Sequence, residues 1–410
     1  MMTDEQSQRR NELLAVCKDI AESESILDKL EDELRLQGFA GPTDLPKLVF
    51  LCLATRFSDK PVSLVIKGPS GSGKSFSLHA GLQFVPPSAY EEFSGMSEKA
   101  LVYSENLVLK NRYLVIGEAA GLSHGDGRAF LRQLLSEGTI RYVTVQKSPS
   151  GMTSKELKPI EGPTGLIMTT TANALHPEDE SRMLSYHLDE SVERVREALV
   201  SQAQSSQLEK RQLDTKCWFA LHDFIGSEDW SVVIPFSEQL ARKLPLSHFR
   251  VMRDFPQVLS LIKANALMHQ LNRERTKDGE VIATLSDYQV VYDLISGPLA
   301  QGLEEAVPET IRAVVEKVRA LESAAPKDTF GTFGISQIQL AEELGRDQSV
   351  VSRHVRKAVG MGFLKDLTPG QGKKATLVMG DRELPEGSVL PKPEEIEEEA
   401  AVREEVKLAA

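Results

Sequence analysis

The chain has 410 residues, a formal net charge of −12, and 41% hydrophobic and 26% charged residues. This length exceeds one ordinary hydrophobic core and predicts two or three domains. No apolar run approaches the roughly 20 residues that span a bilayer, and residues 1–10 lack a signal-peptide pattern, so no membrane partner is expected. The cysteines, Cys17, Cys52 and Cys217, lie far apart, which excludes a CxxC metal site and predicts reduced thiols in a cytoplasmic protein.

The negative charge is concentrated at the two ends. Residues 1–40 hold ten acids and five bases, and residues 383–410 hold nine acids and three bases. An apolar stripe with helical spacing runs through the first segment and ends at Gly38, which predicts an acidic helical arm over 1–40. This arm either packs on the body of the protein or contacts another subunit or a partner. Residues 385–410 predict an acidic, disordered tail.

The next elements predict a nucleotide-binding loop. Residues 45–57 predict a helix, Val62–Ile66 a short buried strand, and residues 76–84 a second helix. The loop between strand and second helix has the Walker A sequence Gly68, Pro69, Ser70, Gly71, Ser72, Gly73, Lys74, Ser75. Its glycines let successive backbone N–H groups wrap phosphates, while Lys74 reaches the β- and γ-phosphates and Ser75 binds Mg²⁺. The sequence therefore predicts that ATP and Mg²⁺ bind here.

Two further strands complete this predicted site. Residues 113–116 form an apolar strand that leads into Gly117 and Glu118, and we assign Glu118 to the metal site and to polarising the attacking water. Gly117 stands where a second acid is usual, which predicts weaker metal binding or slower turnover. Residues 165–170 form the third strand, whose polar end offers candidates for contact with the γ-phosphate or the water: Thr170, Thr171 and Asn173. Strands that alternate with helices predict a parallel α/β sheet.

A hairpin is predicted between the second and third strands, over residues 138–163. Residues 140–145 alternate, 147–151 give a turn signal, and 157–160 return as the second strand. Its predicted tip carries Lys147, Lys155 and Lys158. After the third strand we expect a polar helix over 188–212, an all-helical region over 213–300, and a last helix that begins near Pro308.

The segment 326–384 predicts a DNA-binding unit. Residues 335–345 have helical spacing with a glycine stop, and Ser349 is expected to cap a second helix over 350–359. The second helix presents a polar face made of Gln348, Ser352, Arg353, Arg356 and Lys357. Two strands then flank a basic tip that contains Lys373 and Lys374. Residues 331–382 hold eight bases and five acids, and the pattern resembles the winged helix of bacterial regulators, which suits duplex DNA or a protein contact.

Taken in order, these parts resemble an AAA+ ATPase of the pre-sensor hairpin branch, which holds the MCM replicative helicases. They also resemble the MCM-like ATPases of mobile genetic elements, which carry a C-terminal winged helix. The resemblance covers about residues 45–385 and includes Ser181-Arg182 followed by a short strand that ends at Asp189-Glu190. It implies an α/β fold: a P-loop AAA+ core over 41–212 with a helical lid over 213–325, followed by the winged-helix domain.

The resemblance also implies roles for single residues. Arg182 would be an arginine finger that acts on a neighbour's ATP, which requires a homo-oligomeric ring or filament. Arg253, with Arg250 as second choice, would be the arginine of the sensor-2 helix. Lys147, Lys155 and Lys158 would contact a DNA single strand in the central channel. The acidic termini would be contacts for replication proteins.

The leading hypothesis is an ATP-hydrolysing DNA helicase, or helicase-like translocase, that acts in DNA replication. The alternative is an ATP-dependent switch or loader that assembles on DNA through the winged helix and recruits a partner without unwinding. A protein-remodelling ATPase is the third reading. No glycine-phenylalanine loop of the kind that engages sigma factor is present, which disfavours a transcriptional activator.

Overall fold

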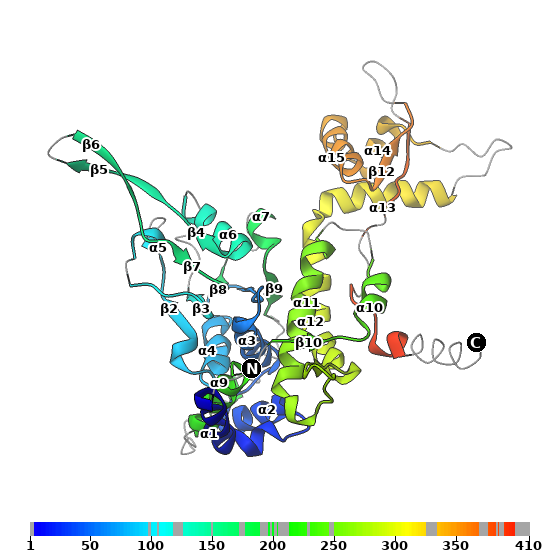
Figure 1. Cartoon of the computed structure of the whole chain (residues 1–410). Coiled ribbons are helices and arrows are strands. Elements are labelled where there is room, and N and C mark those ends of the chain that lie inside the picture. The colour runs from blue at the N-terminus through cyan, green and yellow to red at the C-terminus, as the bar shows by residue number, and fades with distance from the viewer. Residues whose placement is uncertain are drawn as a thin grey trace. The chain divides into compact units, whose positions relative to one another are not determined.

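The computed structural model divides the chain into two compact units (Figure 1). The first comprises residues up to Leu244, Arg250–Leu299 and the segment from Val389, and the second is built on Ala300–Ser388. None of the described helices is long and apolar enough to cross a membrane. The structure describes residues 4–96, 100–104, 106–117, 126–148, 151–171, 177–188, 196, 199–200, 203, 213–227, 230–245, 250–324, 334–368, 376–382, 384 and 389–397.

A five-stranded parallel sheet forms the centre of the first unit, in the order β2-β3-β8-β1-β9. The strands are β1 (Leu64–Lys67), β2 (Tyr90–Phe93), β3 (Arg112–Ile116), β8 (Thr164–Thr170) and β9 (Leu184–His187). The three strands expected from apolar runs, β1, β3 and β8, are present and almost entirely buried. The predicted α/β class with a parallel sheet is therefore confirmed. Strand β2 was missed because two glutamates interrupt its sequence.

Helices alternate with these strands along the chain. They are α3 (Asp44–Ala54), α4 (Lys74–Leu82), α5 (Ala100–Tyr103), α6 (Asp126–Glu137) and α7 (Pro177–Glu180), with 3-10 turns at Thr55–Phe57 and Pro87–Ala89. Leu131 and Leu134 of α6 join the buried cluster that contains Leu114 and Leu166 of the sheet. Gly81 of α4 lets that helix approach α3 closely, since a Cβ there would lie 2.8 Å from the Pro46 carbonyl oxygen.

The N-terminal segment packs on the body. It forms α1 (Asp4–Ala21) and α2 (Ile26–Leu36), and Ser25 caps α2 by accepting from the Asp28 N–H at 3.3 Å. Helix α1 lies against α9 (Thr215–Ile225), and the apolar stripe is buried at Cys17, Ile20, Ile26, Leu27, Leu30 and Leu34. Of the two readings of this segment, the packing helix is confirmed.

The region after the sheet is mainly helical and belongs to the same unit up to Leu299. It contains α9, α10 (Ser237–Lys243), α11 (Val251–Met268), a 3-10 turn at Gln270–Asn272 and the start of α12 (Leu285–Ala306). The all-helical prediction is wrong at one point, because β10 (Val232–Val233) and β11 (Val281–Ile282) pair in parallel. Most of the helix expected over 188–212 lies outside the described residues.

The second unit contains α13 (Glu309–Ala324), α14 (Gln337–Leu344), α15 (Gln348–Gly360) and the antiparallel strands β12 (Leu364–Asp366) and β13 (Leu377–Met379). It begins near Ala300 rather than at 326, because Ile311, Val315 and Val318 of α13 are buried in one core with Leu340 and Val355. Asp347, not Ser349, caps α15: its carboxylate accepts from the Ser349 N–H at 2.8 Å.

Part of the acidic tail is ordered, contrary to expectation. Val389, Leu390 and Ile396 are buried, and residues 393–397 form a helical turn. The Tyr288 hydroxyl of α12 donates to the Pro391 carbonyl oxygen at 2.6 Å. The apolar residues of this segment therefore pack on the first unit. The expectation of disorder was based on net charge and did not take these residues into account.

Candidate functional site

The phosphate loop joins β1 to α4, as the sequence predicts. Gly71 and Gly73 have φ of 82° and 88°, a left-handed conformation that glycine adopts without strain. The Lys74 ammonium donates to the carbonyl oxygens of Gly68 at 2.8 Å and Pro69 at 2.7 Å. The Ser72 hydroxyl oxygen is buried and has no hydrogen-bond partner within the described residues. The loop therefore combines three groups that can bind a phosphate: the Lys74 ammonium, the Ser72 hydroxyl and the N-terminus of α4.

The neighbouring strands bring further polar groups to the same edge of the sheet. Lys67, which precedes the loop, pairs in register with Thr170 of β8. Thr170 is buried, and Thr171 follows it and is exposed. Thr169 donates its hydroxyl to the carbonyl oxygen of Gly117, at the end of β3. Glu118 and Asn173 lie outside the described residues.

Sequence reasoning missed two features at this edge, the Thr169 hydrogen bond and an aromatic pair. Phe76, one residue after Ser75, stacks on Phe39 with ring centroids 5.3 Å apart and planes 7° apart. Phe76 remains 63% exposed, although a phenylalanine is ordinarily buried. The only sequence signal was an aromatic residue directly behind the Walker serine.

Arg182 lies in a cluster of arginines from three elements. Its Nε donates to the Ser136 hydroxyl of α6 at 2.9 Å, and its guanidinium also donates to the Glu178 carbonyl oxygen. Burial, together with the charges of Arg253 and Arg132, lowers the pKa of Arg182. Glu178 and Asp179, which pair with Arg132, offset part of this repulsion.

The two arginines at the start of α11 differ in their surroundings. Arg250 is mostly buried, pairs with Asp254 at 3.0 Å, and donates to the Met183 carbonyl oxygen at 3.0 Å. Arg253 is exposed and donates to the Ser181 hydroxyl. Arg250 therefore holds α11 against the turn before β9, whereas Arg253 presents its charge to solvent beside Arg182.

Arg182 lies where the strands of the sheet begin, and the phosphate loop of the same chain lies where they end. Strand β9 runs parallel to β1, with Leu184 beside Leu64 and His187 beside Lys67. Arg182 precedes the amino end of β9, and Gly68 follows the carboxyl end of β1. The length of β1 separates these ends by about 13 Å at 3.3 Å per residue. The Arg182 guanidinium donates to Ser136 of α6 and to Glu178 of α7.

The predicted hairpin is present and projects from the first unit (Figure 1). At its base β4 (Thr139–Ile140) pairs with β7 (Ile160–Glu161), and beyond them β5 (Val143–Ser148) pairs with β6 (Gly151–Glu156). Only Lys147 lies near the tip, opposite Met152. Lys155 pairs with Thr144 near the base, and Lys158 follows β6 in the connection to β7, so the expected tip cluster is wrong for these two.

The hairpin also has an apolar face that the sequence analysis did not note. In an antiparallel pair, opposed residues share one face. Val143, Val145 and Lys147 therefore share a face with Met152, Ser154 and Glu156. On this face Val143, Val145 and Met152 are 58%, 64% and 73% exposed. Exposed apolar groups around a lysine suit a surface that contacts a ligand or partner.

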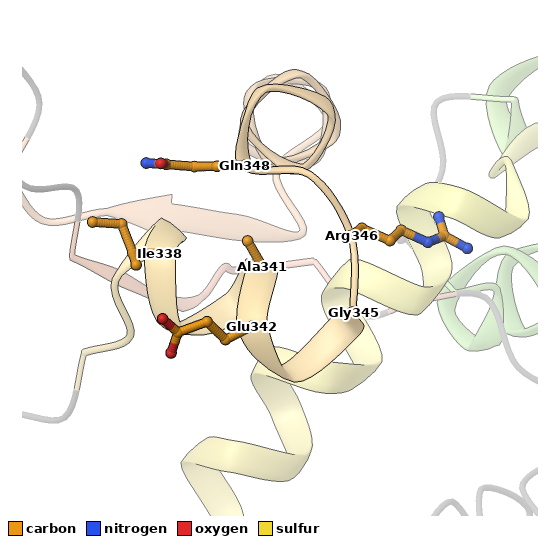
Figure 2. A pocket seen from close by; sticks show the side chains of 6 residues that line it. All are labelled: Ile338, Ala341, Glu342, Gly345, Arg346 and Gln348. Atoms are coloured by element: carbon orange, nitrogen blue, oxygen red, sulfur yellow. The ribbon is translucent and has the colours of Figure 1, made fainter.

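In the second unit, α14 and α15 form a helix-turn-helix followed by a two-stranded β-sheet. Val351 and Val355 of α15 are buried. The side chains of Gln348, Arg353, Arg356 and Lys357 are exposed and that of Ser352 is partly buried, as expected for a polar face. A hollow of about 400 Å³ lies on α14 and the turn, and Figure 2 shows Ile338 and Gln348 on one side of it while Arg346 points away. Lys373 and Lys374 lie outside the described residues.

No family model and no curated protein matches the chain. Among solved structures, it is similar to Orc1 of Aeropyrum pernix in complex with DNA, with 12% identity over 82% of this chain and 88% of that chain and a TM-score of 0.26. Two point mutants of RuvB from Thermotoga maritima are 13% identical over 84% of this chain and 93% of theirs, with TM-scores of 0.29 and 0.27. Likeness at this level carries no weight for function, which rests on the chain's own side chains.

Proposed function

We propose that this chain is an AAA+ ATPase that acts on DNA as a homo-oligomeric ring, as a helicase or helicase-like translocase in DNA replication. The observation that carries the proposal is the placement of Arg182 and the phosphate loop at opposite edges of one sheet. Such a chain holds half of a composite site at each edge. A ring or filament completes every site by placing one copy's Arg182 at the next copy's loop.

The cis half of the site consists of the phosphate loop and the neighbouring strand ends. Lys74 exchanges its bonds to the loop carbonyls for phosphate oxygens, Ser75 contributes a hydroxyl to Mg²⁺, and Glu118 orients the attacking water. Thr170, in register with Lys67 before the loop, and Thr171 after it are the proposed contacts to the γ-phosphate or the water. The exposed ring of Phe76 suits stacking of the adenine base.

The trans half is the arginine cluster. Arg182 acts as the finger that stabilises charge on the transferring phosphoryl group. Arg253 is the better sensor arginine, because it is exposed beside Arg182 whereas Arg250 is engaged with Asp254 and Met183.

DNA contact is proposed at two surfaces. The hairpin offers Lys147 to the backbone of a single strand, with Val145 and Met152 on the same face for contact with unstacked bases. Lys155 and Lys158 contribute charge closer to the hairpin base. The exposed face of α15, carrying Arg353, Arg356 and Lys357, suits duplex DNA. Lys373 and Lys374 of the basic segment that follows in the sequence are proposed as further DNA contacts.

The test compares ATP turnover with and without single-stranded DNA, and then fork unwinding. The variant is Lys147→Ala/Lys155→Ala, and the matched control is Lys60→Ala/Lys277→Ala, which removes two exposed lysines elsewhere in the first unit. We expect DNA to stimulate turnover of the wild type and the control, and stimulation and unwinding to be lost in the hairpin variant. The proposal would be refuted if the ATP turnover of all three proteins were the same with and without DNA.

A second function has support from Gly117. With glycine before Glu118 the site lacks one carboxylate, and slow hydrolysis suits an ATP-dependent switch or loader that binds DNA through α15 and recruits a partner. This reading predicts ATP-dependent assembly on duplex DNA without unwinding. Loss of that assembly in Arg353→Ala/Arg356→Ala, with the hairpin variant unaffected, would favour the switch over the helicase.

A further inference from the structure

A second cavity, of about 440 Å³, lies in the first unit away from the phosphate loop. Its walls come from α1, the turn after α3, the start of β3 and the end of α9. Arg112 at the start of β3 pairs with Thr164, whereas Thr170 at the other end of β8 pairs with Lys67, beside the phosphate loop. At about 3.3 Å per residue the two places are about 20 Å apart along the sheet. A nucleotide at the phosphate loop therefore leaves this cavity empty.

Positive charge dominates the walls of the cavity. The ionisable side chains that line it are Arg9, Arg56, Lys110, Arg112 and Asp223. Arg56 pairs with Asp223 at 3.1 Å, and Arg112 pairs with Glu91 at 2.6 Å. Neither Arg9 nor Lys110 forms an ion pair with any residue that the structure describes, and both are exposed. The cavity thus has two positive charges in excess, a surplus that favours an anion.

Arg56 is held in a fixed position at the wall. It is 3% exposed and its guanidinium carbon lies 4.1 Å from the Phe57 ring centroid. It donates to the His222 carbonyl oxygen at 3.3 Å and contacts the His222 Nδ1. Burial, and then the charge of Arg56, lowers the pKa of His222 well below its usual value, so the neutral ring can accept. A cation fixed before binding loses little conformational entropy when a ligand arrives.

Arg112 has hydrogen-bonding capacity left over. Its terminal nitrogens reach Glu91 and the Tyr90 carbonyl oxygen, at 2.6 Å and 3.0 Å, but its Nε is buried and has no hydrogen-bond partner within the described residues. A ligand can reach this donor only if the Arg112 side chain shifts, because its Nε has no accessible surface. The surplus charge of the lining side chains is therefore the feature that points to the ligand.

We propose that this cavity binds a small phosphate-bearing anion. Guanidinium groups match phosphate oxygens in geometry, and a phosphate monoester carries about −1.5 to −2 charges at pH 7, which matches the two uncompensated cations. The volume lies in the range of small-ligand sites. The ligand joins α1, through Arg9, to the start of β3, the strand that leads to Gly117. Binding at the cavity does not depend on the proposed ATPase activity.

The test is a thermal-shift titration of the full chain with inorganic pyrophosphate, in saturating ADP and Mg²⁺ to fill the phosphate loop. Pyrophosphate is expected to raise the Tm of the wild type. Arg9→Ala/Lys110→Ala should weaken its apparent affinity by about tenfold or more, because two charge-assisted contacts are lost. The matched control, Lys18→Ala/Lys60→Ala, removes the same charge at exposed positions outside the cavity and should bind like the wild type.

The absence of a Tm shift in the wild type, or equal shifts in all three proteins, would overturn the proposal. Lys74→Ala separates this site from the phosphate loop, because it should lose ADP binding and keep the pyrophosphate response. Competition by a single-stranded oligonucleotide that depends on Arg9 and Lys110 would assign the cavity to a phosphodiester backbone and overturn the small-anion assignment. A response that disappears in Lys74→Ala would place pyrophosphate at the phosphate loop instead.

Discussion

Thr169, the penultimate residue of β8, donates its side-chain hydroxyl to the backbone carbonyl of Gly117, the residue that follows β3. Thr169 is 1% exposed, so the bond is shielded from water. It ties the strand beside the phosphate loop to the residue that precedes Glu118. Because Gly117 has no side chain, β8 reaches it through this bond to its backbone carbonyl.

Thr169→Val is therefore expected to lower ATP turnover by about five- to tenfold while nucleotide affinity changes little, because valine keeps the shape but not the hydrogen bond. Thr164→Val is the matched control. It removes a hydroxyl-to-carbonyl bond of 2.7 Å between β8 and Arg112 of β3, at the opposite edge. Steady-state kinetics and nucleotide titration are measured for both variants. Equal losses of turnover would show that the Thr169 bond contributes only to the structure of the sheet.

Arg182→Ala is expected to lower turnover about a thousandfold and to leave ATP binding intact, because the arginine serves a neighbouring copy. Lys74→Ala should lose nucleotide binding. Mixing the two inactive proteins should restore part of the activity, since some interfaces then combine an intact loop with an intact Arg182. Turnover measured across mixing ratios tests this, and no recovery at any ratio would contradict action in trans.

Asp287 predicts a pH-dependent contribution to stability. It is fully buried and accepts from Arg273 at 2.7 Å, Asn265 at 2.9 Å and the Thr284 N–H at 2.8 Å. Burial alone raises the pKa of Asp287, but these hydrogen bonds outweigh it and lower the pKa below its usual value. A depressed carboxyl pKa stabilises the fold above the unfolded pKa of about 3.9, and this contribution is lost as the pH falls through the folded pKa.

Asp287→Asn should accordingly cost about 3 kcal/mol of unfolding free energy at pH 7, because Arg273 is left without its charge partner. The difference from wild type should shrink as the pH falls below about 4. Urea denaturation at several pH values measures it. The exposed Asp278→Asn serves as control and should follow the wild type throughout.

The C-terminal segment predicts a last result. Ile396 is fully buried in the first unit, so Ile396→Ala should lower the unfolding free energy by about 2 to 4 kcal/mol. Glu394→Ala, an exposed neighbour, should leave the Tm unchanged within error. Thermal unfolding of both variants is the measurement. Equal Tm values would mean that residues 389–397 do not pack on this unit in solution.

The sequence by itself determined the parts whose signal is local. The phosphate loop, the strands β1, β3 and β8 and the helices α14 and α15 follow from glycine spacing, apolar runs and helical periodicity, which act over a few residues. Charge in the tail hid its buried residues, and two glutamates interrupt the pattern of β2. Lys155 and Lys158 were misplaced because hairpin register depends on pairing across strands.

Only the tertiary structure decided how these parts meet. Three features involve residues far apart in the chain: the bond from Thr169 to Gly117, the different partners of Arg250 and Arg253, and the cavity lined by Arg9 and Arg112. Such contacts arise when the chain folds back on itself. Arg182 and Gly68 likewise lie at different ends of two neighbouring strands because β1 and β9 are parallel and in register. Spacing along the sequence does not encode this arrangement.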